Sequence, residues 1–301
     1  MDPASIQTAV DVLRKGGLVA FPTETVYGLG ADADQEPALK AIFRVKGRPE
    51  SHPLIIHLHS VDQLQDWAVS IPPSAMDLGR KFWPGPLTLI LKKAPRVAGV
   101  ATGGQDTVGL RVPDHPVALS LLRSFGGGVA APSANRFWRV SPTTAEHVRQ
   151  DLGGDVDFIL DGGPCSIGVE STIIDFSSSE PVILRPGGLT KERLEEALGC
   201  SVPVKGAGLV RVSGQLESHY APRAMVLIAP PADSGRMADD LRSKGKRVAL
   251  LGDKDVAAPL LYASLRRADE SGADVIVVPL PEEEGLGLAV ADRLRKAAGK
   301  R

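Results

Sequence analysis

Two cations near the start of the chain stand where they could bind the negative charge of a small molecule. Lys46 and Arg48 are separated only by Gly47, so both could converge on one anion if the backbone between them is extended. Arginine offers a planar fork for a carboxylate or a phosphate, whereas lysine offers a point charge. The alternative is a solvated helix end, where cations are favoured in any case. Taken alone, the motif favours that alternative.

Arg111 and His57 lie inside apolar runs, where a polar side chain needs a partner. An arginine in the middle of the run 110–112 is rarely buried alone. A carboxylate ligand would provide its partner, and so would an aspartate or glutamate of the protein itself. A lone histidine in the run 54–58 is more often a satisfied core residue than a functional one.

Polar residues also gather where several apolar runs end. Phe21–Gly30 brings two threonines, a glutamate and a tyrosine to the end of a short run, which is where α/β proteins bind ligands. The segments 131–135 and 141–143 carry serine, asparagine and threonine, although turn and cap chemistry selects the same residue types. The segment 168–175 adds a glutamate and a serine, and Arg185 follows one predicted strand later.

Several familiar site patterns are absent or badly placed. The segment 28–33 matches the glycine pattern of dinucleotide folds, but residues 22–27 separate it from the preceding strand. A second match at 285–289 has no strand directly before it. The sequence has no P-loop, nucleophile elbow, zinc-protease motif or paired-cysteine motif. The remaining residues favour a site that binds and orients charged small molecules rather than one that attacks them.

Hydrophobic periodicity predicts the elements that position these residues. Ser5, Thr190 and the pair Ser141-Pro142 are predicted to begin helices. Helices are expected over 5–15, 38–45, 61–68, 117–123, 143–150 and 189–198, and strands over 17–20, 54–58, 87–91, 108–112, 129–131, 158–160, 171–175 and 182–185.

The last third of the chain changes character twice. Residues 199–223 are rich in glycine and proline with little periodicity, which indicates a linker. Strand and helix patterns then alternate to the end, as in a small parallel α/β unit. We therefore expect a large α/β domain over 1–205, with a twisted, mixed open sheet and a concave face, a linker over 206–223, and a small Rossmann-like domain over 224–301.

Composition limits the class of protein. Lysine and arginine number 35 and aspartate and glutamate 36, so the formal net charge is −1 and no global field attracts nucleic acid. The two cysteines do not suggest a disulfide scaffold. The first residues do not form a signal peptide, and no apolar run approaches the ~20 residues that span a bilayer. We expect a cytoplasmic protein.

The order and spacing of the motifs are far more specific than any one of them. The series closely resembles the YrdC-like family in its long, two-domain form. His219-Tyr220-Ala221-Pro222 resembles the linker motif of that form, and 261–278 and 285–298 resemble its C-terminal domain. The motifs that carry the resemblance are Pro22–Leu29, Lys46–Pro49, Pro53–His57, Pro84–Thr88, Arg111–Pro113, Ser133–Asn135, Ser141–Thr143, Glu170–Ile173 and Arg185–Gly187.

The resemblance implies a nucleotidyltransferase reaction in which L-threonine, bicarbonate and ATP give threonylcarbamoyl-adenylate and pyrophosphate. Other proteins would then transfer the product to the adenosine beside the anticodon of certain tRNAs, so tRNA binding by this chain is expected to be weak or indirect. Magnesium would arrive on the nucleotide, and the protein itself is expected to hold no metal.

The resemblance also implies roles for individual residues. Lys46 and Arg48 are the expected catalytic pair, because charge builds on phosphate oxygens as pyrophosphate leaves. The residues expected around L-threonine are Thr25, His57, Arg111, Ser171 and the backbone of Ala131. Those expected around ATP are Lys46, Arg48, His52, Thr107, Ser133, Asn135, Ser141, Arg185 and Tyr220, with Tyr220 closing over the nucleotide.

The chain departs from the family pattern at a few positions. Residues 136–139 (Arg-Phe-Trp-Arg) replace the small residues usual there, and the two aromatics could stack on adenine, lie out of the way or block the pocket; we expect the second. His52 stands where asparagine is common, and Ser213 where the linker usually has proline. Two rival interpretations are a carbamoyl-transfer module of hydrogenase maturation and a nucleic-acid-binding module; the cysteine pattern and near-neutral charge disfavour them.

Overall fold

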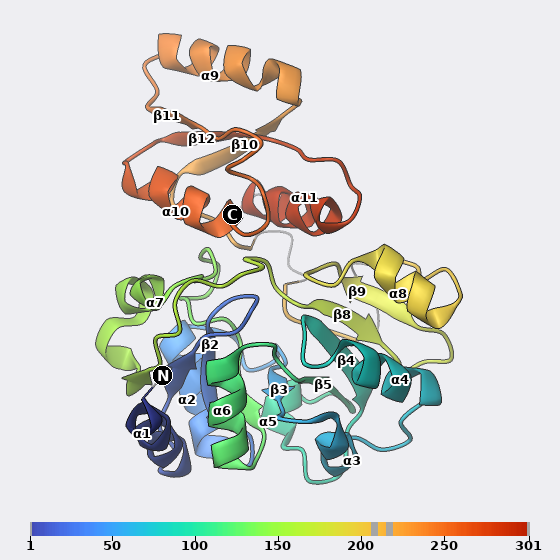
Figure 1. Cartoon of the computed structure of the whole chain (residues 1–301). Helices are drawn as coiled ribbons and strands as arrows, with labels where there is room; N and C mark the ends of the chain where they lie inside the picture. Colours follow the sequence, from blue (N-terminus) through green and yellow to red (C-terminus); the bar gives the residue numbers. More distant parts are fainter. Residues whose placement is uncertain (1, 206–209, 215–218, 300–301) are drawn as a thin grey trace.

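The larger part of the chain is built on one nine-stranded mixed sheet (Figure 1). The computed structural model describes residues 2–205, 210–214 and 219–299. The strands lie in the order β7-β1-β2-β6-β3-β5-β4-β8-β9. Their bounds are β1 Val19–Phe21, β2 Gly28–Asp32, β3 Ile55–His57, β4 Leu87–Lys92, β5 Thr107–Arg111, β6 Val129–Ala130, β7 Phe158–Ile159, β8 Thr172–Asp175 and β9 Val182–Arg185.

Side chains alternate between the two faces of this sheet, and the faces are covered differently. Ile56 and Leu110 belong to the main hydrophobic core, together with residues of α2, α3 and α4. On the opposite face, α1 and α6 cover only the end near β1 and β6. His57 and Arg111 are register partners on β3 and β5 and point to that second face. At the other end of that face, Val210 and Val212 of the linker pack against strand residues, which leaves the part between the two ends for a site.

The helices of the larger part are mostly short and lie beside the strands that precede or follow them. The α-helices are α1 Pro3–Arg14, α2 Glu36–Lys46, α3 Leu64–Trp67, α4 Pro73–Phe82, α5 Gly99–Thr102, α6 Pro116–Phe125, α7 Ala145–Leu152 and α8 Lys191–Leu198, and the 3₁₀ helices are η1 Val61–Gln63 and η2 Gly153–Asp155. The predicted helix over 61–68 is split between η1 and α3, and α4 and α5 had not been predicted.

Two of the predicted helix starts are wrong and one is confirmed. The first helix begins with Asp2 as its N-cap rather than Ser5, because the Asp2 carboxylate accepts the Ala4 N–H at 3.1 Å. Helix α7 is capped by Thr144 rather than opened by Ser141-Pro142. The Pro142 carbonyl instead accepts the Tyr27 N–H at 2.9 Å, which ties this segment to the loop after β1. Thr190 caps α8 as predicted.

The segment with the dinucleotide-like glycine pattern is a strand. Gly28–Asp32 forms β2, which pairs antiparallel with β1. A Cβ atom at Gly30 would lie 2.8 Å from ring carbon Cε1 of Phe21 and 2.8 Å from Cγ1 of Val129. Glycine is needed there because neighbouring side chains fill the space, so the pattern has a packing role rather than a phosphate-binding role.

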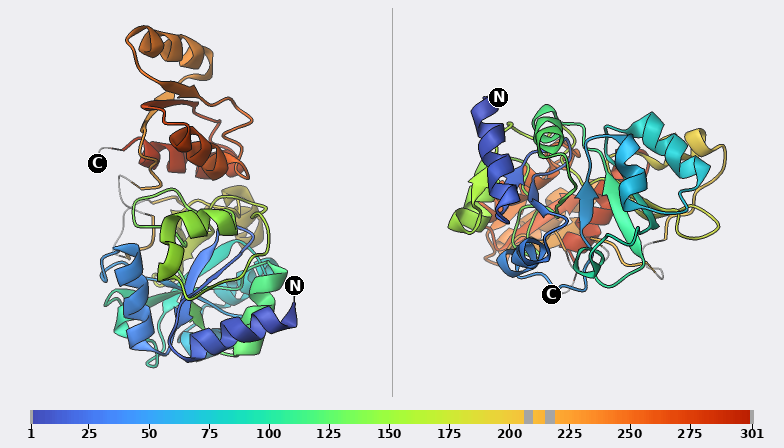
Figure 2. Two further views of the ribbon diagram at one scale, coloured as in Figure 1. Left: turned by 90° about the vertical axis from the view of Figure 1, so that its left-hand side faces the viewer. Right: turned by 90° about the horizontal axis from the view of Figure 1, so that it is seen from below.

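The C-terminal part contains a three-stranded parallel sheet in the order β10-β12-β11. Figures 1 and 2 show this part standing on one end of the larger part, with α10 and α11 next to it and α9 on the far side. The elements are β10 Met225–Ala229, η3 Pro231–Asp233, α9 Ser234–Ser243, β11 Val248–Leu250, α10 Leu261–Glu270, β12 Val275–Pro279 and α11 Leu286–Ala297.

One hydrophobic cluster joins the two parts. Val26, Val140 and Val169 of the larger part share it with α10, α11 and the three-stranded sheet. The α/β class, the mixed sheet and the small parallel sheet are confirmed. Residues 206–209 and 215–218 of the predicted linker lie outside the described residues. In the part of the chain that the structure describes, no helix is long and apolar enough to cross a bilayer.

Candidate functional site

A narrow pocket lies on the second face of the large sheet, where strand ends and the linker meet. Its free volume is about 50 Å³, room for a few water molecules only. Linker residues 213, 219 and 220 contribute to its wall. The pocket is lined by Thr23, Thr25, Val26, Gly28, Arg48, Ile55, His57, Arg111, Ala131, Pro132, Ser133, Glu170, Ser171, Arg185, Ser213, His219 and Tyr220.

Arg111 is the buried cation at one side of this pocket. Its Nη2 lies 2.8 Å from Oε1 of Glu24, and both side chains are only 5% exposed. The same nitrogen donates a hydrogen bond to Thr25 Oγ1 at 2.9 Å. Of the two partners that the sequence allowed for this arginine, the structure shows a glutamate of the protein itself. The ion pair and hydrogen bond fix the guanidinium in a place where it can meet a ligand carboxylate.

The loop after β1 is held in shape by its own threonines. Thr23 Oγ1 donates to the Val26 carbonyl at 2.6 Å and accepts the N–H groups of Thr25 and Val26 at 3.2 Å each. Such short-range bonds replace the strand ladder at this point. They turn Thr25 toward Arg111, so the short stretch from Thr23 to Gly28 builds one wall of the pocket.

His57 lies beside Arg111 on the neighbouring strand and is uncharged at neutral pH. Burial and the charge of Arg111 lower the pKa of its imidazole to about 3. Its ring packs edge-on against Phe21, with centroids 5.7 Å apart. His57 is thus a buried, neutral neighbour of the arginine that lines the pocket, but it is not a satisfied core residue, because its Nδ1 has no hydrogen-bond partner among the described residues.

Arg48 and Arg185 form the cationic side of the pocket. Arg185 donates to the Ser171 carbonyl from Nη2 at 2.9 Å, and to Ser171 Oγ at 3.1 Å. Arg48 Nη2 donates to the Pro53 carbonyl and to Ser213 Oγ, each at 3.0 Å. Arg185 Nη1 also donates to the Ser213 carbonyl at 3.1 Å. Both guanidinium groups stay charged at neutral pH, and linker residue Ser213 lies between them.

Lys46 does not point into the pocket with Arg48. The backbone at Gly47 is left-handed (φ 64°, ψ 33°) rather than extended, so the two side chains diverge. Lys46 is the last residue of α2 and is buried. The alternative prediction of a helix end at this motif is therefore confirmed, but the prediction that this end is solvated is wrong. Its Nζ donates to the carbonyls of Ser133 and Asn135, and burial lowers its pKa well below the ordinary lysine value.

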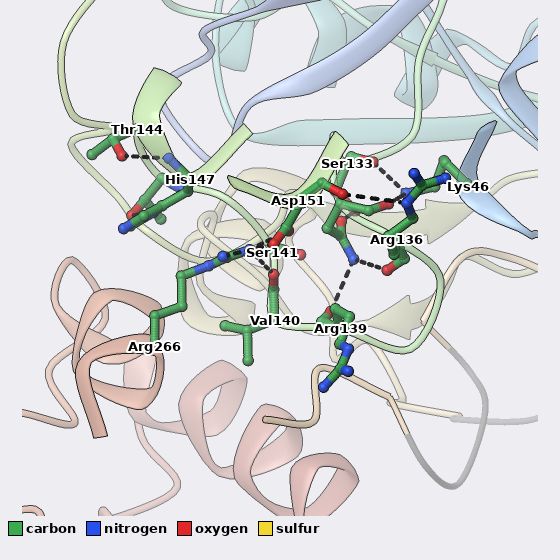
Figure 3. A network of polar contacts seen from close by, with 12 residues as sticks. Lys46, Ser133, Arg136, Arg139, Val140, Ser141, Thr144, His147, Asp151 and Arg266 are labelled. Carbon is green, nitrogen blue, oxygen red and sulfur yellow. Dashed lines mark hydrogen bonds and ion pairs between the residues drawn. The ribbon is translucent and has the colours of Figure 1, made fainter. Parts of the chain in front are cut away.

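The loop that Lys46 fastens is a closed network of polar contacts (Figure 3). Ser133 donates to Asn135 Oδ1, and Asn135 Nδ2 donates to the carbonyls of Arg136 and Arg139 at 2.8 and 2.9 Å. Ser133 lines the pocket, whereas the Asn135 side chain forms its hydrogen bonds within the loop. The loop therefore presents backbone and one hydroxyl to the pocket, and its remaining polar groups hold its shape.

The two unusual aromatics of this loop behave differently. Trp138 is 45% exposed and points out of the way, as expected. Phe137 is 9% exposed and packs on the pocket rim, with its ring centroid 5.8 Å from Cζ of Arg48. It also contacts His52 and His219 edge-on, with centroids 5.5 and 5.9 Å apart. Phe137 thus covers a cation of the site.

The predicted residues divide into two groups. Those that the structure brings together in the pocket are Thr25, Arg48, His57, Arg111, Ala131, Ser133, Ser171, Arg185 and Tyr220. Those that do not line it are Lys46, His52, Thr107, Asn135 and Ser141. His52 lies behind Phe137, Thr107 begins β5 opposite Lys92, and Ser141 donates to Glu170 at 2.6 Å.

Sequence reasoning missed three polar residues of the site. Glu24, Glu170 and Ser213 carry no role in the sequence prediction, yet they hold Arg111, Ser141 and Arg48 in place. The only signal in the sequence for the two glutamates was their position, since Glu24 directly precedes Thr25 and Glu170 directly precedes Ser171. Within the described ranges, no group of three or more histidine, cysteine, aspartate or glutamate side chains could hold a metal ion.

Two family models match the chain. The Sua5, YciO and YrdC model, which is described as telomere recombination, matches residues 11–187. A model described as threonylcarbamoyl-AMP synthase, C-terminal domain, matches residues 189–299.

Similar proteins cover almost the full length. Threonylcarbamoyl-AMP synthase of Pyrococcus abyssi is 45% identical, with 98% of this chain and 94% of that protein covered. The Bacillus subtilis protein of the same name is 41% identical, with 100% and 94% covered. The crystal structure of P. abyssi Sua5 complexed with L-threonine superposes with a TM-score of 0.94, at 43% identity, and covers 99% of this chain and 95% of that one.

Proposed function

The chain belongs to the Sua5, YciO and YrdC family in its threonylcarbamoyl-AMP synthase form, and from this premise we propose what its pocket does. The protein joins L-threonine, bicarbonate and ATP into threonylcarbamoyl-AMP and releases pyrophosphate and water. The observation that supports this most is the pairing, in one narrow pocket, of the buried cation Arg111 with the separate cations Arg48 and Arg185. An amino acid carboxylate and a triphosphate need two such sets of charges.

The threonine half of the pocket is proposed around Arg111. Its guanidinium binds the carboxylate, and Thr25, His57, Ser171 and the backbone of Ala131 surround the rest of the molecule. Because His57 is neutral, it does not repel the ammonium group of the ligand. Once that group is deprotonated, its nitrogen attacks the carbon of dissolved carbon dioxide and loses a proton to solvent, or it attacks bicarbonate, whose C–OH bond breaks with release of water; either route gives a carbamate.

The ATP half is proposed around Arg48 and Arg185. A carbamate oxygen attacks the α-phosphorus, the bond from that phosphorus to the bridging oxygen breaks, and pyrophosphate leaves. Arg48 and Arg185 stabilise the charge that develops on the phosphate oxygens. The other residues proposed for ATP are Lys46, His52, Thr107, Ser133, Asn135, Ser141 and Tyr220. Lys46 would act next to Ser133, whose carbonyl it binds.

The linker residue Ser213 is proposed to give way to the nucleotide. It accepts hydrogen bonds from Arg48 and Arg185 that phosphate oxygens would otherwise receive. The free volume of about 50 Å³ cannot hold a triphosphate beside it. We infer that residues 210–214 move outward as ATP enters, and that Tyr220 then rests against the nucleotide.

Further parts of the proposal concern cofactor, organisation and setting. Magnesium enters with ATP and keeps several waters. Residues 1–205 are the catalytic domain, 206–223 the linker and 224–301 the C-terminal domain. The enzyme works in the cytoplasm and passes its product to threonylcarbamoyl-transferring proteins that modify tRNA, which it contacts weakly or not at all.

Pyrophosphate release from ATP tests the proposal. L-Threonine and bicarbonate are each left out in turn, and release that needs both supports the synthase. Release without threonine would contradict it, because ATP would then be hydrolysed rather than used to adenylate a carbamate. RNA binding with a steep dependence on salt and without any turnover would favour a nucleic-acid-binding module instead.

A further inference from the structure

Glu170 lies in the pocket wall, but its hydrogen bonds come from two distant parts of the chain. Its Oε1 accepts the Ser141 hydroxyl at 2.6 Å. Its Oε2 accepts the Tyr262 hydroxyl at 2.8 Å and Nε of Arg293 at 2.7 Å. Burial alone would raise the pKa of this carboxyl, but Arg293 and Arg185 lower it to about 2. Glu170 is therefore an anion shared by the pocket and the C-terminal part.

Tyr220 is held by the same two residues of the C-terminal part. Its ring stacks on that of Tyr262, with centroids 5.8 Å apart and planes 24° apart. Cζ of Arg293 lies 5.1 Å from the Tyr220 ring centroid. The backbone of Tyr220 has a positive φ of 59°, which a bulky residue adopts only when its surroundings impose it. The position of this ring is thus set by α10 and α11.

A third contact fixes the backbone next to Ser141 (Figure 3). Arg266 donates to the carbonyl of Val140 and forms an ion pair with Asp151 in which the side chains are 9% and 15% exposed. Arg266 follows Tyr262 by one turn of α10, so the two side chains leave the same face of the helix. Ser141 is therefore held on one side by Glu170 and on the other through its neighbour Val140.

We propose that Tyr262 and Arg293 are positioning residues for ATP: through Glu170 they orient Ser141 behind the pocket wall, and through direct ring contacts they place Tyr220 in that wall. This inference rests on the proposed function. The C-terminal part then supports a wall of the active site from behind rather than being an appended module. It acts without touching threonine, since Arg111 and Thr25 have their own partners in the larger part.

Packing alone does not account for these polar contacts. The shared hydrophobic cluster already joins the two parts through Val26, Val140 and Val169. A buried charged pair adds little to stability compared with apolar residues of the same volume. Arg293 is fully buried and Glu170 nearly so. Their contribution is best explained by orientation, because an ionised carboxylate that two other donors, Tyr262 and Arg293, hold in place can fix the Ser141 hydroxyl in one direction.

The first test replaces Tyr262 by phenylalanine, which keeps the stack on Tyr220 and removes one hydrogen bond to Glu170. We expect KM for ATP to rise about tenfold, as for the loss of one hydrogen bond to a charged acceptor. L-Threonine affinity, measured by calorimetry without ATP, should change less than twofold. An unchanged KM for ATP, or an equal loss for both substrates together with a lower Tm, would overturn the proposal.

A double-mutant cycle shows whether the hydroxyl acts through Glu170. In a Glu170→Gln background, Tyr262→Phe should change KM for ATP less than twofold, whereas independent, multiplicative effects would refute the mechanism. A matched pair on α11 adds a control: Arg293→Met should weaken ATP binding more than tenfold, and Arg295→Met, which breaks only a surface pair with Glu283, should not.

The same variants distinguish a failure of the proposed synthase function from a failure of the positioning role. If the wild-type protein releases pyrophosphate without threonine, the proposed function fails, and calorimetric ATP binding by Tyr262→Phe still tests the positioning role. If the wild type is a normal synthase and Tyr262→Phe binds ATP as the wild type does, only the positioning role fails. Should Arg293→Met not fold, the phenylalanine variant and its cycle decide.

Discussion

Replacing Arg111 by methionine should separate its contribution to stability from its contribution to binding. Arg111 is the only cation that the structure places within ion-pair distance of Glu24, among the described residues. Neither carboxylate oxygen of Glu24 accepts a hydrogen bond from those residues. Arg111→Met therefore leaves a buried anion without compensation. Breaking such a pair costs about 3–5 kcal/mol, which corresponds to a fall in Tm of about 5–8 °C for a chain of 301 residues.

A second change should restore stability without restoring function. Glu24→Gln in the Arg111→Met background replaces the buried anion by a neutral amide of the same shape, so most of the lost Tm should return. L-Threonine binding should stay undetectable, because no guanidinium remains to meet its carboxylate. Differential scanning calorimetry measures the first effect, and isothermal titration with L-threonine measures the second.

Two results would refute this reasoning. An unchanged Tm in Arg111→Met would show that the pair does not neutralise Glu24, and recovered threonine binding in the double variant would show that Arg111 does not hold the ligand. Arg80→Met is the control, because its partner Asp77 lies 3.8 Å away and both side chains are mostly exposed. Its effect should stay below about 1 kcal/mol.

Three further predictions concern other positions. Burial and a neighbouring arginine lower the pKa of His57 to about 3, so below the ordinary histidine pKa the unfolded chain binds one proton more than the folded chain. This proton should lower the free energy of unfolding by roughly 2 kcal/mol as the pH falls from 7 to 5. Over the same pH change, the Tm of His57→Asn should fall less than that of the wild type. Phe137→Ser uncovers a cation and should change KM for ATP at least threefold, whereas Trp138→Gly should leave it within twofold. Gly187→Ala should abolish soluble expression or lower Tm by more than 10 °C, since its Cβ would lie 2.3 Å from the Glu170 carbonyl oxygen.

Much of the fold could be predicted from periodicity because most elements bury a regular face. The strands over 108–112 and 182–185 differ from their observed bounds by at most a residue. Two predicted helix starts were wrong because another residue caps the helix. Asp2 caps the first helix, directly before Pro3. Thr144 caps α7, and the predicted start at Pro142 instead binds the backbone of Tyr27. Helix α4 was missed although its buried face is regular, because the apolar residues over 73–82 are few.

The site could be predicted less completely, because side-chain direction depends on single dihedral angles. Lys46 and Arg48 were expected to act together, but the left-handed turn at Gly47 sends one into the loop 133–139 and the other into the pocket. Asn135 was expected at ATP, and its side chain is used by carbonyls of its own loop. Residue types identified the neighbourhood, whereas only the backbone decides which groups face the ligand.

The contribution of the C-terminal part was beyond sequence reasoning for a different reason. Tyr262 and Arg293 are separated from Glu170 by 92 and 123 residues along the chain, and each sits in an ordinary amphipathic helix. Helical periodicity puts Arg293 on the face that Ala289, Val290 and Leu294 bury, and Arg295 off it; the first is fully buried and the second is 48% exposed. The partner of Arg293 is known only from the packing of α11 on the pocket wall. If Arg293→Met and Arg295→Met prove to have equal effects on ATP binding, that packing has no catalytic consequence.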